Sequence, residues 1–272
     1  MTTFARTRAV LMWCIISVSP ALIASEPQPA LTSLKFCHED QNAYPWVFQV
    51  DGKNQGLDIS LLSLVSQKIN IPVEFISLPW KRCLLHLQNA KVHGAIGASF
   101  KAERLNMGRY PVTAKGNLNA NRRIHTSSYS LYIPKQSKLG WNGETFINLD
   151  GPITIQSGFS IGDLIRKLGV QTVEFTNPKD NLKIVIEGRA AGAAMHTDRV
   201  DLILKNNPDL DANIKKYKVP IQTKPYYLML SFELARNHPE LAETIWTTIA
   251  DVRESEEMAN IRNAFYLGSL FE

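Results

Sequence analysis

The sequence predicts an α/β protein built from two similar units. Strand-like apolar segments alternate with helix-like segments in residues 34–99, and the same alternation returns in residues 151–197. Two extended runs, residues 129–134 and 224–234, stand after the first unit and after the second. Strictly alternating strands and helices are typical of parallel sheets joined by right-handed crossovers. We therefore expect two lobes, with the two extended runs crossing between them as a hinge.

The first unit has five elements in order. They are a strand at 34–40, a helix at 56–70, a strand at 71–78, a helix at 79–91 and a strand at 92–99. In the first helix the apolar residues Leu57, Leu61, Leu64, Val65 and Ile69 have the spacing of one helical face. Ligands of such folds bind outside the carboxyl ends of the strands, so we look for the site there.

The second unit repeats this order. It has a strand at 151–157, a helix at 160–169, a strand at 170–176, a helix at 177–188 and a strand at 190–197. The helix at 177–188 has Asn177 as its cap, Pro178 in its first turn and Gly188 past its end. Two further helical patterns, residues 239–253 and 256–266, close the chain.

The N-terminus is typical of an export signal. Arg6 and Arg8 precede the apolar run "VLMWCIISVSPALIA", and small residues follow it before an abrupt polar change. An uncleaved membrane anchor is the competing interpretation, but the run is short for a membrane span and contains Pro20. We expect a signal peptide over residues 1–25, cleaved near Ala24 or Ser25, and a periplasmic location.

Composition excludes several classes of function. The chain of 272 residues is 44% hydrophobic and 20% charged, as expected of a globular protein. Its net charge of +5 falls to +3 once the two signal arginines are removed (5 − 2), which is too mild to indicate nucleic-acid binding. No cysteine or histidine spacing indicates a metal site. We expect no cofactor and a monomer.

Two cysteines remain once Cys14 leaves with the signal. Cys37 and Cys83 form an even pair, and in an oxidising compartment we expect one disulfide between them. Two separate buried thiols remain the alternative, because bridging requires Cα atoms within a narrow distance range.

The order and spacing of several motifs resemble the extracellular solute-binding proteins of family 3. These motifs, spread over nearly all of the exported chain, are "YPW" before "GLDISLL", then "PWKRC", "GASFKAER", "QSGFSIGDL" and "EGRAAGAAMHTD". The resemblance implies the two-lobed type II periplasmic-binding-protein fold, with a mostly parallel sheet flanked by helices in each lobe. We expect lobe 1 at 26–128 plus 227–272 and lobe 2 at 129–226.

The same resemblance places Arg104 in the cleft, where the family's amino-acid receptors pair an arginine with the ligand carboxylate. The residues agree, because small side chains before the turn let a ligand approach the backbone and a planar guanidinium grips a carboxylate with two hydrogen bonds. The alternative is that Arg104 pairs with Glu103 or with a neighbouring residue of its lobe at the surface.

Other cleft candidates follow from the resemblance. An acid after the first strand and an aromatic wall suit the ammonium and side chain of a ligand, although strand-end acids are often merely solvated and aromatic residues often belong to the core. The turn in lobe 2 offers amides and a hydroxyl, and Ser160 is equally interpretable as a helix cap. The candidates are Glu39, Asp40, Tyr44, Trp46, Trp80, Ala98, Ser99, Phe100, Gly158, Phe159, Ser160, His196, Thr197 and Asp198.

The chain also departs from the family pattern. Ala43 stands where an aromatic residue is usual, the turn around Ala98 has few hydroxyls, and Thr197 takes the position of an acid. The ligand is therefore expected to be an amino acid, a related carboxylate or another small polar solute.

The function expected is periplasmic binding of this solute by closure of two lobes, for delivery to an ABC importer. A ligand-sensing partner of a membrane receptor is the alternative, because the same module can present its closed form to a sensor. An exported hydrolase is less favoured, since the six histidines have no recognisable motif partners. The expected partners are thus a small-molecule ligand and either an ABC-transporter permease or a membrane sensor.

Overall fold

The structure is a computed structural model that describes residues 1–2 and 31–266. The described residues 31–266 belong to one compact unit, and the description below concerns that unit. The predicted signal peptide lies, apart from its first two residues, outside the described part of the chain. Among the described residues, no helix has the length and apolar character needed to cross a membrane.

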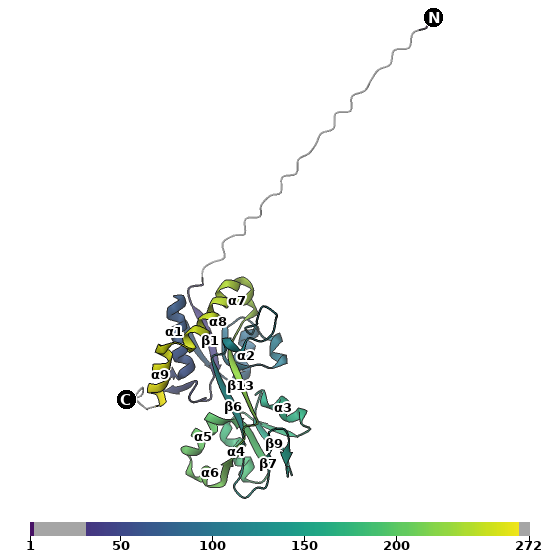
Figure 1. Cartoon of the computed structure of the whole chain (residues 1–272), viewed down its shortest axis with the longest axis vertical. Coiled ribbons are helices and arrows are strands. Elements are labelled where there is room, and N and C mark those ends of the chain that lie inside the picture. The colour runs from purple at the N-terminus through teal and green to yellow at the C-terminus, as the bar shows by residue number, and fades with distance from the viewer. Residues whose placement is uncertain (3–30, 267–272) are drawn as a thin grey trace. The chain divides into compact units, whose positions relative to one another are not determined.

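One mixed sheet runs through the unit in the order β10-β9-β11-β6-β13-β5-β1-β4, with β12 on β6 (Figure 1). The trio β4-β1-β5 is parallel, as is the trio β10-β9-β11, whereas β6 and β13 run antiparallel to their neighbours. The strands are β1 (Leu34–Glu39), β4 (Val73–Leu78), β5 (Gly94–Ser99), β6 (His125–Pro134), β9 (Ile153–Gln156), β10 (Thr172–Phe175), β11 (Gly192–His196), β12 (Ile214–Lys216) and β13 (Gln222–Leu230).

Helices cover both halves of this sheet. In Figure 1, α1, α2, α7, α8 and α9 lie around β1, while α3 to α6 lie around β9. They are α1 (Leu57–Ile69), α2 (Trp80–Gln88), η1 (Ala102–Asn106), η2 (Ala120–Arg122), α3 (Ile161–Lys167), α4 (Pro178–Ile186), α5 (Thr197–Lys205), α6 (Pro208–Asn213), α7 (Phe232–Asn237), α8 (Pro239–Arg253) and α9 (Glu256–Tyr266). Small hairpins are formed by β2 (Phe48–Val50) with β3 (Lys53–Gln55) and by β7 (Gly140–Trp141) with β8 (Phe146–Ile147).

Local sequence signals explain most boundaries. The side chain of Asn177 accepts a hydrogen bond from the Lys179 amide (2.9 Å) at the start of α4, as predicted, and Pro178 occupies the first turn. Gly188 has φ +70°, which only glycine adopts without strain, and stands just past the end of α4. The helix therefore begins and ends within two residues of the predicted limits.

Three expectations about local structure were wrong. The extended run at 224–234 ends at Leu230, because the Ser231 hydroxyl caps the Leu234 amide (3.1 Å) and starts α7. The loop predicted between the first strand and α1 contains the β2–β3 hairpin. Thr197, expected at the end of a strand, begins α5.

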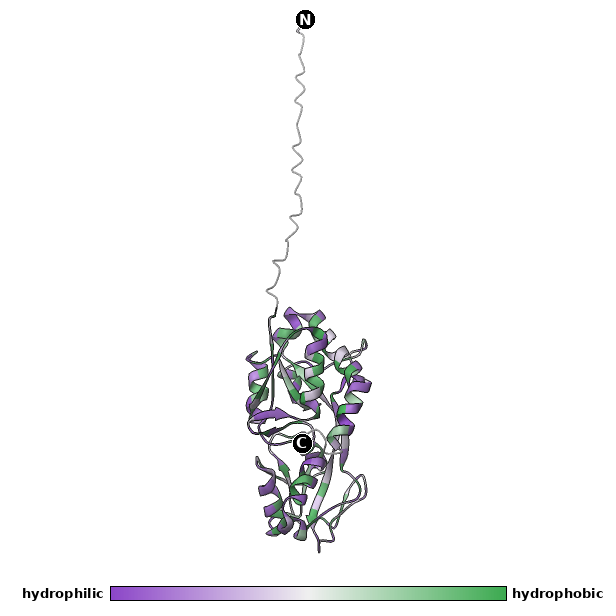
Figure 2. Cartoon of the chain, turned by 90° about the vertical axis from the view of Figure 1, so that its left-hand side faces the viewer, coloured by the Kyte–Doolittle hydropathy of each residue, from purple (hydrophilic) through white to green (hydrophobic). Residues whose placement is uncertain are grey.

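The core forms along the helical faces and strand sides that the apolar pattern indicated. Of the predicted face of α1, Leu57, Leu61, Leu64 and Val65 are buried and Ile69 packs partly buried against the same cluster. Figure 2 shows hydrophobic residues along the strands and mixed hydropathy around the helices, as expected when one side of each helix faces solvent.

Two long strands connect the two halves of the sheet. Residues His125 and Tyr129 of β6 lie opposite Tyr226 and Gln222 of β13, respectively. Beyond this shared stretch, β13 pairs with β5 and β6 pairs with β11. The C-terminal helices α8 and α9 pack on α1. The lobe boundaries at 128/129 and 226/227 stay a prediction.

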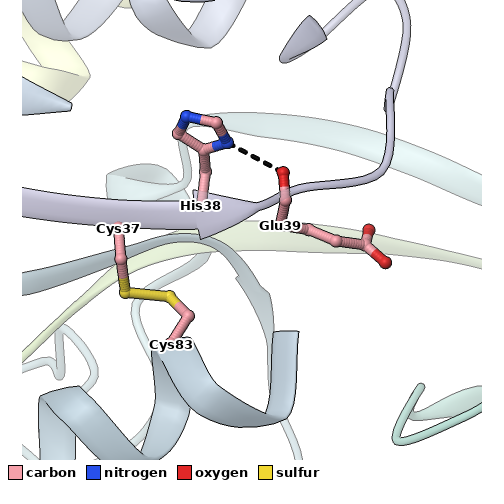
Figure 3. The surroundings of a disulfide bond; sticks show 4 residues. All are labelled: Cys37, His38, Glu39 and Cys83. Atoms are coloured by element: carbon pink, nitrogen blue, oxygen red, sulfur yellow. Dashed lines mark hydrogen bonds between the residues drawn. A yellow bond between two sulfur atoms is a disulfide. The ribbon is translucent and has the colours of Figure 1, made fainter. Parts of the chain in front are cut away.

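The predicted disulfide is present. Cys37 in β1 is bonded to Cys83 in α2, with Cα atoms 5.7 Å apart. Figure 3 shows Cys37 and His38 pointing to opposite sides of β1, as successive strand residues do. The bridge therefore fixes β1 to α2 from one side while His38 and the strand end remain available on the other.

Candidate ligand-binding cleft

A cavity lies where the carboxyl ends of β1 and β5 meet residues of the other half of the sheet. It encloses about 540 Å³ of atom-free space, including its opening to solvent. Both halves contribute to its wall, as a cleft between two lobes requires. The lining residues are His38, Glu39, Ala43, Trp46, Val47, Asp58, Trp80, Ile96, Gly97, Ser99, Arg104, His125, Tyr129, Phe159, His196, Arg199 and Tyr226.

Arg104 is a buried guanidinium in this wall, only 3% exposed. Its Nη1 donates to the carbonyl of Ser99 (2.7 Å) and its Nη2 to the carbonyl of Gly158 (3.1 Å) in the other half. Within the described residues no carboxylate lies within ion-pair distance of Arg104, because Glu103 turns to Lys101 instead (2.8 Å). The alternative pairing of Arg104 with Glu103 at the surface is therefore wrong.

The turn at Gly158–Ser160 faces Arg104 across the cleft. Ser160 stands at the cap position of α3 but makes no capping bond, and its hydroxyl instead bonds the hydroxyl of Ser99 (2.8 Å). An outer ion pair joins Lys101 to Asp163 (3.4 Å) beside it. Ser160 is thus a cross-cleft contact and not a side-chain cap.

A second polar contact crosses the cleft at the end of β1. Glu39 accepts hydrogen bonds from Arg199 (2.6 Å) and from the amide of Gln156 (2.8 Å), and Arg199 also donates to Gln156 (2.6 Å). Burial raises the pKa of Glu39, while the charge and hydrogen bond of Arg199 lower it. The network joins β1, β9 and α5 into one buried unit.

Stacked rings form the base of the cavity. The imidazole of His125 lies between Trp46 (centroids 3.9 Å apart) and Tyr226 (4.9 Å), and its Nδ1 is 2.8 Å from Asp58 Oδ1. The hydroxyl of Tyr226 lies 3.0 Å from His196 Nε2. Burial lowers the pKa of His196 well below its usual value, with Arg199 adding to this effect. His196 is therefore neutral at physiological pH.

The structure brings together about half of the predicted site residues. Those that line the cavity are Glu39, Trp46, Trp80, Ser99, Arg104, Phe159 and His196. Gly158 and Ser160 bond directly to residues of this set, as described above. Their roles in binding stay predictions.

The other predicted residues lie outside the cavity wall: Asp40, Tyr44, Ala98, Phe100, Thr197 and Asp198. Tyr44 packs against Phe48 and Phe265, and Phe100 is 42% exposed. Ala98 faces the opposite side of β5, in the cluster that contains the disulfide. Thr197 and Asp198 bond to β6 through Ser128 and Ser127.

Sequence reasoning missed the cavity residues His38, Asp58, His125, Tyr129, Arg199 and Tyr226. One signal for Asp58 was available, because it shares the apolar face of α1 with Leu61, Leu62 and Val65, where a carboxylate is unexpected. The other residues lie in strands and helices, and the pairing of the strands decides which of their side chains face the cavity. Among the described residues, no group of three or more His, Cys, Asp or Glu side chains is placed to hold a metal ion.

Solved structures with similar folds include sensors and binding proteins. A histidine kinase sensor domain with similarity to periplasmic binding proteins has a TM-score of 0.71 at 16% identity, over 86% of this chain and 96% of that one. An ancestral arginine-binding protein bound to glutamine has a TM-score of 0.68 at 18% identity, over 86% and 98% of the two chains. An ancestral amino acid-binding protein, a precursor of cyclohexadienyl dehydratase, has a TM-score of 0.64 at 15% identity, over 86% and 95%.

These likenesses establish the two-lobed type II periplasmic-binding-protein fold. No curated protein sequence matches significantly. Residues 35–268 match the family described as bacterial extracellular solute-binding proteins, family 3. This match covers most of the chain, including every residue of the cavity wall. The chain therefore belongs to the bacterial extracellular solute-binding proteins of family 3.

Proposed function

We propose that this protein binds a small solute with a carboxylate group, an amino acid or a related acid, and delivers it to an ABC importer. Small-solute binding is the activity of its family. The single observation that supports a carboxylate is Arg104, a buried guanidinium that donates to two carbonyls and one hydroxyl and lies over the Trp80 ring (5.1 Å to its centroid). A buried charge without a counter-charge is costly, so an anionic ligand would compensate it.

The backbone near Arg104 leaves room for such a ligand. Gly97 has φ +77° and lines the cavity, and a Cβ placed on it would meet no atom within 4 Å. A carboxylate can then approach the end of β5 closely while Arg104 holds it through two parallel hydrogen bonds.

Binding would operate by closure of the two lobes. In the proposed division Arg104 and Ser99 belong to lobe 1, and Gly158 and Ser160 belong to lobe 2, so each lobe would supply only part of the polar set. A ligand that contacts both lobes binds the closed form more tightly and shifts the population toward it. We place the hinge in β6 near Tyr129–Tyr132 and in β13 near Tyr226–Leu230, with lobe 1 at 26–128 plus 227–272 and lobe 2 at 129–226.

The location proposed is the periplasm, after cleavage of the signal peptide. The family is extracellular, and the Cys37–Cys83 disulfide suits an oxidising compartment. Delivery to a sensor is the second candidate, favoured by the similarity to a histidine kinase sensor domain. A pull-down from membranes with and without ligand distinguishes a permease from a receptor kinase.

Binding without chemical conversion is the activity we propose. The similar fold of a dehydratase precursor makes this worth testing directly. Recovery of the bound ligand unchanged after prolonged incubation supports a binding protein, whereas conversion to product would indicate an enzyme.

The experiment that tests the proposal is a thermal-shift screen of amino acids, amines and small carboxylates. A ligand that binds only the folded protein raises its stability by RT ln(1 + [L]/Kd). We expect at least one carboxylate to raise the melting temperature of the wild type and to leave the melting temperature of Arg104→Ala unchanged. A screen in which only amines or neutral solutes act would overturn the carboxylate proposal.

A further inference from the structure

A second cavity adjoins the cleft where α1, the start of β6 and the junction of α8 and α9 meet. It encloses about 630 Å³ of atom-free space, including its opening to solvent. Trp46, Asp58 and His125 line both this cavity and the cleft cavity, so the two spaces share a wall. The side away from the cleft carries three arginines and one acid, and we call the cavity the arginine pocket after them: Arg123, Arg253, Glu254 and Arg262.

The arginines of this pocket outnumber their counter-charges. Arg253, at the end of α8, is only 9% exposed, and Arg123 and Arg262 are half-buried. Glu254 accepts a hydrogen bond from Nε of Arg253 (2.8 Å), and its side chain is 67% exposed. Arg123 and Arg262 form no ion pair with any residue that the structure describes. Because a guanidinium stays charged at physiological pH, the pocket carries an excess of positive charge.

The other nearby carboxylates do not cancel this excess. Asp58 shares the wall with the cleft, but its Oδ1 is engaged with His125 and its Oδ2 is sealed from open space. Glu256 and Glu257, in the first turn of α9, do not line the pocket. Glu254 is thus the carboxylate that faces the three guanidiniums.

The guanidiniums keep accessible donors for a bound group. Arg253 donates through Nη1 to the carbonyl of Arg123, and Arg262 donates through Nη2 to the carbonyl of Arg253 (3.2 Å). Nη2 of Arg253, and Nε and Nη1 of Arg262, have no acceptor within the described part of the chain, yet none of these atoms is sealed from solvent. An anion can therefore bind them without breaking an existing hydrogen bond.

The three positive charges act on one point. The hydrogen bond and charge of Arg253, and after them the charges of Arg123 and Arg262, lower the pKa of Glu254. Negative charge beside Glu254 is therefore within electrostatic reach of all three guanidiniums, which come from the segment before β6, from α8 and from α9.

We propose that the arginine pocket binds a free oxyanion of the phosphate class, separately from the ligand of the cleft. A tetrahedral dianion presents oxygens in several directions, which suits planar donors that arrive from three different segments. Its two charges also compensate the excess that a single carboxylate leaves. This site goes beyond the proposed function and does not depend on it.

Titration calorimetry with inorganic phosphate, at constant ionic strength and with chloride as the reference anion, tests this site. We expect phosphate to bind the wild type and to raise its melting temperature, because it binds only the folded chain. Arg253→Met removes the guanidinium and should weaken phosphate binding at least roughly 10-fold, since charge-assisted hydrogen bonds are lost. Should Arg253→Met not fold, Arg262→Gln replaces it with the same expectation.

Glu254→Gln should have the opposite effect. The amide keeps an acceptor for Arg253 but removes the competing negative charge, so phosphate should bind roughly 5-fold more tightly. A cluster with a merely structural role predicts no such gain. Arg236→Gln, which removes an exposed arginine of α7, is the matched control and should bind phosphate as the wild type does.

Vesicles of phosphatidylcholine with and without phosphatidate distinguish a free ion from a lipid headgroup. Arg253 lies recessed at 9% exposure, so we expect phosphatidate to add nothing to the sedimentation of the protein with vesicles. Sedimentation that requires phosphatidate and is lost in Arg253→Met would assign the pocket to a headgroup and overturn the proposal of a free ion.

Arg104→Ala separates the two sites. Phosphate should bind this variant as it binds the wild type, whereas phosphate binding that is lost with Arg104 would place the ion in the cleft and overturn the inference. Absence of phosphate binding to the wild type, or unchanged binding in both Arg253→Met and Arg262→Gln, would overturn it as well. In each of these cases a carboxylate that still binds through Arg104 leaves the proposed function standing.

Discussion

Glu39 and Arg199 form a buried ion pair of 2.6 Å although 160 positions separate them in the chain. Glu39 ends β1 in one half of the sheet, and Arg199 lies in the first turns of α5 in the other. Gln156 bonds both partners and completes the network. The two sides of the cleft are therefore joined by a direct contact between protein groups.

Breaking this pair should favour the open form. Glu39→Gln and Arg199→Met each leave one buried polar group without its partner, and we expect ligand affinity to fall by about 2–4 kcal/mol in each. The double variant should lose much less than the sum, because the two groups act as a unit. Calorimetry on the wild type, the two single variants and the double variant gives the coupling free energy of the pair, and solution scattering follows compaction. Additive losses of binding free energy would mean that the two residues are not coupled in closure.

Arg104→Ala should weaken binding of a carboxylate ligand by about 2–4 kcal/mol, because one partner of a desolvated, charge-assisted pair is lost. Arg104→Lys should recover only part of this, since an ammonium cannot reproduce the two-pronged geometry. Arg82→Ala, which removes an exposed arginine of α2, serves as the control. Wild-type affinity and ligand-induced compaction in Arg104→Ala would place the carboxylate site elsewhere.

Carboxylate binding should be accompanied by proton uptake near pH 8. Burial and, after it, the charge of Arg104 lower the pKa of Lys224 to about 8, with Lys101 acting in the same direction and Asp163 against it. A carboxylate on Arg104 offsets part of that repulsion and raises the pKa of Lys224, so the complex holds more protons at pH 8 than the free protein.

Calorimetry in two buffers with different ionisation enthalpies measures this uptake. At pH 6 it should vanish, because Lys224 is protonated in both states, and in Lys224→Met it should be absent at every pH. Uptake of the same size in Lys224→Met would assign the proton to another group.

Reduction of the Cys37–Cys83 bridge should lower the free energy of unfolding by about 4 kcal/mol, the loop-entropy value for a separation of 46 residues. Denaturant unfolding with and without reductant measures the change, and Cys37→Ser with Cys83→Ser should reproduce it without reductant. Thiol titration of the unreduced, denatured chain starting at Glu26 should find no free thiol. Two free thiols would rule out the bridge in solution.

The sequence by itself was enough for the alternation of strands and helices, the cap at Asn177 and the buried face of α1. These depend on residue type and spacing along a short stretch of chain, which the printed sequence displays directly. The place of Arg104 in the cavity wall could be predicted through local reasoning together with the family resemblance, whereas its role in binding stays a prediction. The disulfide could be predicted because two cysteines remain in the exported chain and the expected compartment is oxidising.

Tertiary structure decided which side chains meet in the cleft. Tyr44 and Trp46 are two positions apart, yet Tyr44 packs against Phe265 while Trp46 stacks on His125 at the cavity. Arg199 reaches Glu39 only because sheet pairing sets α5 opposite the end of β1. The composition of a segment and the spacing of its apolar residues show which side of a helix or strand is buried. The partner that a side chain meets across a cleft depends instead on the register and packing of segments far apart in the chain, and no local pattern contains that information.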